Sequence, residues 1–158
     1  HRLAKFCEGK RVLDICCNSG GFAVYAAVLG KAKEVVGLDL DESALELARQ
    51  NAGLNQARLR WVQADLFPWL RDAIAQKNLF DVVILDPAKQ TRDRDEIDMA
   101  LRRYFDMNRL ALQVVRARRP RRRTRHPGVG HPRSGGRSSL PIAGPRRSIP
   151  EGGVFARA

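Results

Sequence analysis

A buried strand that runs into a turn of small residues and then into a helix begins at Val12, and this order limits the chain to few folds. The run up to Ile15 is apolar except for Asp14, small or polar residues follow as far as Gly21, and apolar residues resume at Phe22. Such a turn directs free N–H groups of a helix N-terminus toward one point, where an anionic group can bind. The turn matches neither G-x-G-x-x-G nor the phosphate loop that ends in Gly-Lys-Ser/Thr. It therefore predicts a ligand-binding turn of another kind.

Hydrophobic strands and helices alternate along the chain before residue 116. Strands are predicted over 11–16, 34–40, 59–63 and 80–85, and helices over 22–29, 42–53, 67–76 and 96–115. This alternation predicts an α/β fold, a Rossmann-like doubly wound parallel sheet with helices on both faces. In the second helix we expect Asp41 as the N-cap and Ala44, Leu47 and Ala48 as the inner stripe.

The C-terminal part of the chain has a different composition. Residues 1–115 hold 17 Lys and Arg against 16 Asp and Glu, whereas residues 116–158 hold 12 Arg and a single acidic residue, Glu151. The second segment is rich in Pro and Gly and poor in apolar residues, so we predict that it is disordered. It is either a basic arm for RNA or an out-of-frame product of a GC-rich gene. On the second interpretation the domain 1–115 is incomplete and its sheet ends at the fourth strand, with an uncovered edge.

The cysteines and the hydropathy indicate the cellular environment to expect for the protein. Cys7, Cys16 and Cys17 have no zinc-site spacing, and adjacent residues of a strand point to opposite faces, so no metal site and no disulfide is predicted. Free thiols are typical of the reducing cytoplasm. No run of about 18 apolar residues occurs, so no membrane span is predicted. Because the first residue is His1 and not Met, we expect a fragment of a longer protein.

Four aspartates accompany the four predicted strands. They are Asp14, Asp39, Asp65 and Asp86. The carboxyl ends of parallel strands line one edge of a sheet, and ligands of open α/β sheets bind there. A single Asp after a strand is ordinary turn chemistry. Four in succession favour one shared site over four separate turns.

Two segments resemble a known family. The run Leu-Asp-Ile-Cys-Cys-Asn-Ser-Gly-Gly-Phe-Ala at 13–23 resembles the cofactor loop of class I S-adenosylmethionine (SAM) methyltransferases, in particular the bacterial large-subunit ribosomal RNA cytosine-5 branch. Asp-Pro-Ala-Lys at 86–89 is similar to the Asp-Pro-Pro-Lys of that branch, and 102–111 also looks like its helix. The resemblance covers about residues 2–115. It implies SAM as the cofactor and ribosomal RNA as the partner.

The resemblance also implies roles for individual residues. The turn residues Asn18 to Gly21 would cradle the methionine part of SAM, and Asp14 would lie near its amino group. Asp39 would accept the ribose hydroxyls, and Asp65 would lie at the adenine edge. The implied cofactor-binding set is thus Asp14, Asn18, Ser19, Gly20, Gly21, Asp39 and Asp65. The implied catalytic residue is Asp86, which could bind a pyrimidine edge or handle a proton.

Methylation of cytosine at carbon 5 needs a further residue. A cysteine thiolate attacks carbon 6 and makes carbon 5 nucleophilic, and the family places that cysteine beyond its fifth strand. This chain has no cysteine after Cys17, so we expect weak SAM binding and negligible turnover. Two alternatives stay open: a class I methyltransferase for another base, a protein or a small molecule, which needs positioning alone, and a non-catalytic RNA-binding module. Arg102, Arg103 and Arg109 are either phosphate contacts or a solvated helix face.

Overall fold

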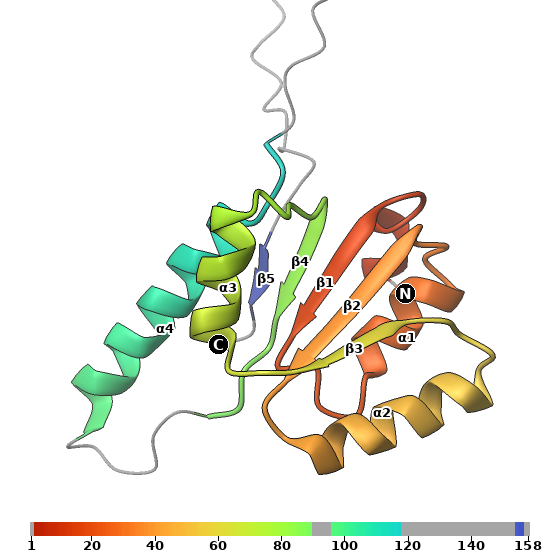
Figure 1. Ribbon diagram of the computed structural model, residues 1–158, viewed down its shortest axis with the longest axis horizontal. Coiled ribbons are helices and arrows are strands. Elements are labelled where there is room, and N and C mark those ends of the chain that lie inside the picture. The colour runs from red at the N-terminus through yellow and green to blue at the C-terminus, as the bar shows by residue number, and fades with distance from the viewer. Residues whose placement is uncertain (1, 90–95, 118–153, 157–158) are drawn as a thin grey trace, which may run out of the picture.

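The chain forms a five-stranded parallel sheet with helices on both faces (Figure 1). The structure, a computed structural model, describes residues 2–89, 96–117 and 154–156. The strands are β1 (Arg11–Ile15), β2 (Glu34–Asp39), β3 (Arg60–Gln63), β4 (Val82–Leu85) and β5 (Val154–Ala156), in the spatial order β3-β2-β1-β4-β5. The helices are η1 (Leu3–Phe6), α1 (Gly21–Val28), α2 (Glu42–Leu54), α3 (Leu66–Ala75) and α4 (Ile97–Gln113).

The predicted fold class is confirmed, and one edge of the sheet differs from the prediction. Each predicted strand and helix is present, with its ends within two residues of the expected ones. The fourth strand is not an uncovered edge, because β5 pairs with β4 through Val83 and Val154, and through Leu85 and Ala156. The predictions of disorder and of an out-of-frame origin concern residues that, apart from 116–117 and 154–156, lie outside the described part of the chain.

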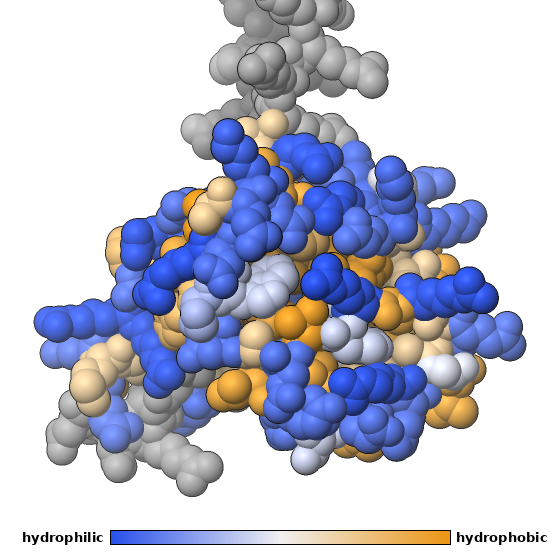
Figure 2. Space-filling model, viewed as in Figure 1, coloured by the Kyte–Doolittle hydropathy of each residue, from blue (hydrophilic) through white to orange (hydrophobic). Residues whose placement is uncertain are grey.

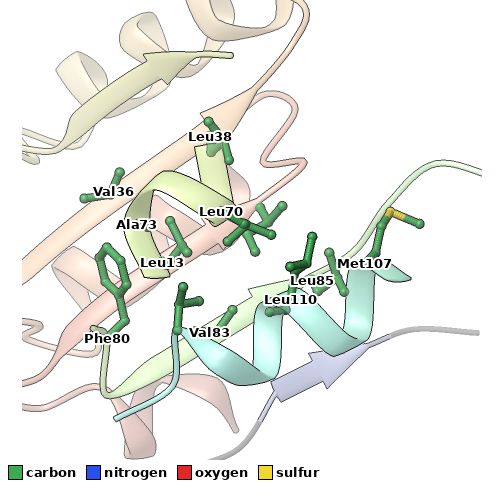
Figure 3. Packing of buried hydrophobic residues seen from close by; sticks show 13 residues of the cluster. Leu13, Val36, Leu38, Leu70, Ala73, Phe80, Val83, Leu85, Met107 and Leu110 are labelled. Carbon is green, nitrogen blue, oxygen red and sulfur yellow. The ribbon is translucent and has the colours of Figure 1, made fainter. Parts of the chain in front are cut away.

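The alternation of side chains along β1 divides the core into two layers. Leu13 and Ile15 pack with α3 and α4, and Val12 packs on the opposite face, with η1 and α1. The larger layer gathers Leu70, Phe80, Met107 and other buried residues around β1 and β4 (Figure 3). Successive residues of a strand point to opposite faces. Asp14 therefore lies on the α1 side, directly after the buried Leu13.

Helix α2 begins as predicted but buries a different stripe. The side chain of Asp41 accepts a hydrogen bond from the Ser43 N–H at 2.8 Å, which confirms the N-cap. Leu45, Ala48 and Ala52 are buried, at helical spacing, whereas Leu47 is 53% exposed. The predicted inner stripe is wrong at Leu47, because the buried face of the helix runs through Leu45, Ala48 and Ala52 and leaves Leu47 outside it.

Arg11 links several elements at the end of the sheet where β1 and β2 begin. Its guanidinium donates to both carboxylate oxygens of Glu34, at 2.6 and 3.1 Å, to the Leu79 carbonyl at 2.7 Å and to the Asn78 side chain at 3.1 Å. It also lies 4.9 Å from the centroid of the Phe80 ring. Arg11 thus joins β1, β2 and the segment before β4. Among the helices that the structure describes, none is long and apolar enough to cross a membrane.

Candidate functional site

A cavity of about 1060 Å³ opens where β1, β2, β3 and β4 end. Asp39, Asp65 and Asp86 line it. Asp14 is fully buried and does not line it, but it lies close enough to Asp86 and Asp39 to feel their charges. The topology thus brings together the four aspartates that the sequence places at four separate positions, since all strand ends of a parallel sheet meet at one edge. Figure 2 shows apolar surface at the lower centre of the molecule, where the strands of Figure 1 end.

The turn between β1 and α1 forms one wall of the cavity. Cys16 and Asn18 have φ angles of 59° and 48°, in the left-handed region that Asn tolerates better than most residues. The Asn18 N–H donates to the Asp39 carboxylate at 2.8 Å, and the Asn51 side chain of α2 donates to the Ser19 carbonyl at 2.9 Å. The turn is therefore fixed against β2 and α2 while Asn18 and Ser19 line the cavity.

The two glycines of this turn have different roles. Gly20 has a φ of 77°, and a Cβ atom there would lie 2.5 Å from the Trp61 ring and 3.0 Å from Ala48 Cβ. Gly21 faces open space, and it lines the cavity. Gly20 thus allows the turn to pack under the indole of β3, whereas Gly21 keeps the backbone beside the cavity accessible.

Asp14 is a buried carboxyl with one unpaired oxygen. Its Oδ2 accepts a hydrogen bond from the Ala23 N–H of α1 at 3.0 Å, and its Oδ1 has no partner among the described residues. Burial, together with the negative charges of Asp86 and Asp39, raises the pKa of Asp14 to about 7, against the lowering effect of the hydrogen bond from the Ala23 N–H. A cation or a hydrogen-bond donor placed above Oδ1 would stabilise the ionised form.

The aspartates at the other strand ends also shape their own turns. Asp39 accepts from the N–H groups of Asn18 and Asp41, at 2.8 and 3.0 Å. Asp65 is the N-cap of α3 and accepts from the Phe67 N–H at 2.8 Å. The two interpretations of the sequence, a shared site and separate turns, are therefore compatible here. Each carboxylate has further lone pairs beyond those that the turn uses.

Sequence analysis missed the apolar lining of the cavity. Leu40 and Leu66 follow Asp39 and Asp65 directly and line the cavity beside them. Leu40 is 67% exposed, which is unusual for a leucine next to a buried strand. The signal in the sequence was an apolar residue immediately after each aspartate. Further lining residues come from η1, α1, α3 and α4: Leu3, Phe22, Tyr25, Phe67, Arg103 and Met107.

The segment after β4 completes the site. Asp86, Pro87 and Ala88 line the cavity, and the Asp86 N–H donates to the Ile15 carbonyl at 3.5 Å. Of the three arginines predicted on the α4 segment, Arg103 lines the cavity and Arg102 does not. Arg109 pairs with Asp106 at 3.4 Å, on the helix itself.

The three cysteines are free thiols. Cys7 is buried and donates to the Leu3 carbonyl. Burial raises the pKa of Cys16 to about 11 and that of Cys17 to about 12, and the neighbouring aspartates add to both shifts. These two thiols of the turn therefore stay protonated near neutral pH and are poor nucleophiles. No group of three or more His, Cys, Asp or Glu suited to a metal ion occurs within 2–89, 96–117 and 154–156.

Comparison with known proteins gives the family. Residues 12–110 match the family model described as methyltransferase domain. The chain belongs to this family. The match spans β1 to α4 and so includes each of the four aspartates.

Relatives of this methyltransferase domain carry ribosomal RNA in their names. The chain is 45% identical over 115 residues to the ribosomal RNA large subunit methyltransferase I of Aeromonas hydrophila, and 41% identical over 114 residues to that of Tolumonas auensis. These matches cover 71% and 70% of the chain but only 29% and 28% of the relatives. The prediction of a class I methyltransferase related to the large-subunit ribosomal RNA enzymes is confirmed, and the chain spans less than a third of the length of these relatives.

Solved structures share the architecture. TrmN from Thermus thermophilus is 33% identical with a TM-score of 0.53, and the match covers 73% of this chain and 32% of that one. SMU.776 complexed with SAH is 23% identical with a TM-score of 0.60, over 72% of this chain and 30% of that one. The second likeness concerns the fold alone. Together they confirm the class I methyltransferase fold of this domain.

Proposed function

We propose that this methyltransferase domain binds SAM in the cavity at the strand ends and belongs to an enzyme that methylates large-subunit ribosomal RNA. The observation that carries the proposal is a cavity lined by Asp39, Asp65 and Asp86, with Asp14 buried close to two of these carboxylates and its Oδ1 unpaired among the described residues. SAM is cationic at its sulfonium and its amino group, so this set of carboxylates complements it. The names of the relatives favour ribosomal RNA as the substrate.

The parts of SAM fit the residues of the cavity. The loop from Asn18 to Gly21 would hold the methionine part, because the first N–H groups of α1 suit its carboxylate and Asp14 below suits its amino group. Asp39 would accept the ribose hydroxyls. Leu40 and the residues around Asp65 offer an apolar slot with a polar edge for adenine. When bound, SAM supplies a methyl group on sulfur that an electron-rich substrate atom accepts.

Cytosine carbon 5 is the target that the resemblance of 86–89 implies, with Asp86 as the catalytic residue. From the end of β4, Asp86 would accept a hydrogen bond from the base or take a proton. The thiolate that this reaction needs is not supplied by Cys16 or Cys17, whose thiols stay protonated. We therefore expect the 158 residues to bind SAM with negligible turnover. The free thiols also fit a cytoplasmic protein.

The same cysteines favour a second candidate function. Direct transfer of a methyl group to a nitrogen or oxygen atom needs no thiolate and relies on positioning. The raised pKa values of Cys16 and Cys17 are compatible with such a reaction and do not assist the carbon-5 reaction. The substrate would then be another base, a protein side chain or a small molecule.

Calorimetric titration of the chain with SAM, S-adenosylhomocysteine (SAH) and NAD tests the proposed cofactor. We expect SAM and SAH to bind and compete with each other, and NAD to give no heat of binding. A chain that is folded by circular dichroism and binds neither SAM nor SAH would contradict the proposal. An assay with methyl-labelled SAM and ribosomal RNA separates the two reactions, since rapid formation of 5-methylcytidine would contradict the expected lack of a thiolate and an N-methylated base would favour direct transfer.

A further inference from the structure

The cavity has an aromatic wall that the proposed cofactor contacts do not use. Phe22 and Tyr25 line the cavity from α1 and are 41% and 46% exposed. Residues three apart on a helix lie on the same side, so the two rings form one surface. The volume of about 1060 Å³ is at the upper end of the range of roughly 300–1,000 Å³ for pockets that hold one small ligand.

A free cation lies on the other side of the same cavity. Arg103 projects from α4, is exposed, and forms no ion pair with any residue in the described part of the chain. Helix α4 covers one face of the sheet and α1 the other (Figure 1). The aromatic wall and Arg103 therefore flank the cavity from opposite faces, and Asp86 at the end of β4 also lines it.

We propose that Phe22 and Tyr25 stack on the unpaired substrate base of an RNA strand and that Arg103 binds a phosphate of the same strand. This proposal rests on the proposed function and names the residues that would hold its substrate. Base–aromatic stacking tolerates any base, because each base has a π-face. Arginine matches phosphate oxygens in a bidentate way.

The charges in the cavity favour one side of it for the RNA backbone. Asp39 and Asp65 repel phosphate from the half proposed for the cofactor. The sugar–phosphate chain is therefore expected on the Arg103 side. Reading of single-stranded RNA by aromatic side chains requires a base that is splayed out of its stack. An aromatic wall continuous with the proposed methyl-donor cavity suits such a base better than it suits a paired duplex.

The stacking half of the proposal is tested by RNA affinity in saturating SAH. The probe is a seven-nucleotide single-stranded RNA that contains one cytidine, followed by fluorescence anisotropy. We expect Phe22→Ala and Tyr25→Ala each to weaken binding at least about fivefold, and Tyr25→Phe to keep it, because the ring remains. Leu29→Ala is the matched control, since Leu29 is 51% exposed at the end of the same helix and does not line the cavity.

The phosphate half is tested by salt dependence. Arg103→Gln is expected to weaken RNA binding. It is also expected to make the negative slope of log affinity against log salt concentration shallower by about 0.7. Arg102→Gln is the matched control, because Arg102 is the exposed neighbour on α4 that does not line the cavity. SAH affinity, measured by calorimetry, is expected to be the same in all of these variants.

Each result supports or overturns a defined statement. Loss of RNA affinity in Phe22→Ala and Tyr25→Ala but not in Leu29→Ala supports stacking, and equal affinities in all three overturn it. A loss in Tyr25→Phe as large as in Tyr25→Ala also overturns stacking. A chain that binds SAH but no RNA overturns this inference and leaves the proposed cofactor site intact. A folded chain that binds no SAH overturns the proposed function itself.

Discussion

Strand β1 carries a charged residue near each end, and the structure treats the two in opposite ways. At the start of the strand, the Arg11 guanidinium is paired with Glu34, Asn78 and the Leu79 carbonyl. Three residues later, Asp14 is fully buried, and one of its oxygens has no partner in the part of the chain that the structure describes. A buried polar group without a partner costs free energy. The chain thus bears a cost at one end of the sheet that it avoids at the other.

The difference shows which end of the sheet is built for stability and which for binding. Around Arg11, side chains from successive elements satisfy one another, and this residue does not line the cavity at the strand ends. Around Asp14, whose Oδ1 is unpaired among the described residues, left-handed turn residues and exposed apolar side chains line one cavity. Unpaired buried polar atoms and left-handed backbone angles of this kind are typical of functional sites. Four predictions test this contrast.

Removing Arg11 should cost stability and leave ligand affinity unchanged. We expect Arg11→Leu to lower the free energy of unfolding by about 3 kcal/mol, since it removes the hydrogen bonds from the guanidinium to Glu34, Asn78 and the Leu79 carbonyl. The measurement is urea denaturation followed by circular dichroism, with Arg71→Leu on the exposed face of α3 as the control. If the remaining folded protein lost SAH affinity as well, the two ends of the sheet would not be separable.

The two adjacent glycines of the turn should respond differently to the same substitution. Gly20→Ala is expected to destabilise the protein by about 2 kcal/mol, because it combines a φ of 77° with a Cβ atom 2.5 Å from the Trp61 ring. Gly21→Ala meets open space and should change stability by less than about 1 kcal/mol. Thermal denaturation of both variants measures the difference. Equal losses would mean that the turn is not packed against Trp61.

Changing Asp39 should affect the ligand more than the fold. We expect Asp39→Asn to weaken SAH binding about tenfold or more, because it replaces a charged acceptor of the ribose hydroxyls, and to cost about 1 kcal/mol of stability. Calorimetric titration gives the affinity. Asp72→Asn on the exposed side of α3 is the control. Unchanged SAH affinity in Asp39→Asn would remove the ribose role proposed for this residue.

Asp14 should make stability depend on pH. The folded protein holds the proton of Asp14 up to about pH 7, whereas the unfolded chain loses it near 3.8. The folded state therefore binds more protons between these values, so the free energy of unfolding falls as the pH rises, by up to about 1.4 kcal/mol per pH unit. Asp14→Asn should remove this contribution. Urea denaturation from pH 4 to 8 checks it, and a slope that persists unchanged in Asp14→Asn would assign the effect to other groups.

Bound SAH offers a sharper form of the same test. Its amino group, placed above Oδ1, would lower the pKa of Asp14 and release the proton. SAH affinity is then expected to rise between pH 6 and pH 8 in the wild-type chain and to stay flat in Asp14→Asn. An affinity independent of pH in both proteins would place the amino group elsewhere.

Much of the fold could be predicted because its signals are local. The apolar runs of Glu34–Asp39 and Val82–Leu85 favour buried parallel strands, and Asp41 caps its helix as its side chain predicts. The stripe of α2 could not be placed to the residue, because small apolar residues occur on more than one side of that helix. The short strand Val154–Ala156 was missed, since three residues carry too little periodicity to be recognised.

The sequence by itself determined the order along the chain of the first four strands and their helices, and the aspartate that accompanies each of these strands, because hydrophobic periodicity and turn chemistry are properties of neighbouring residues. Only the tertiary structure decided that Asp14 is fully buried while Asp39 and Asp65 line the cavity. It also brought Phe22 of α1 and Arg103 of α4 to the same opening. Their meeting depends on which face of the sheet each helix covers, and pairing between distant strands sets that arrangement.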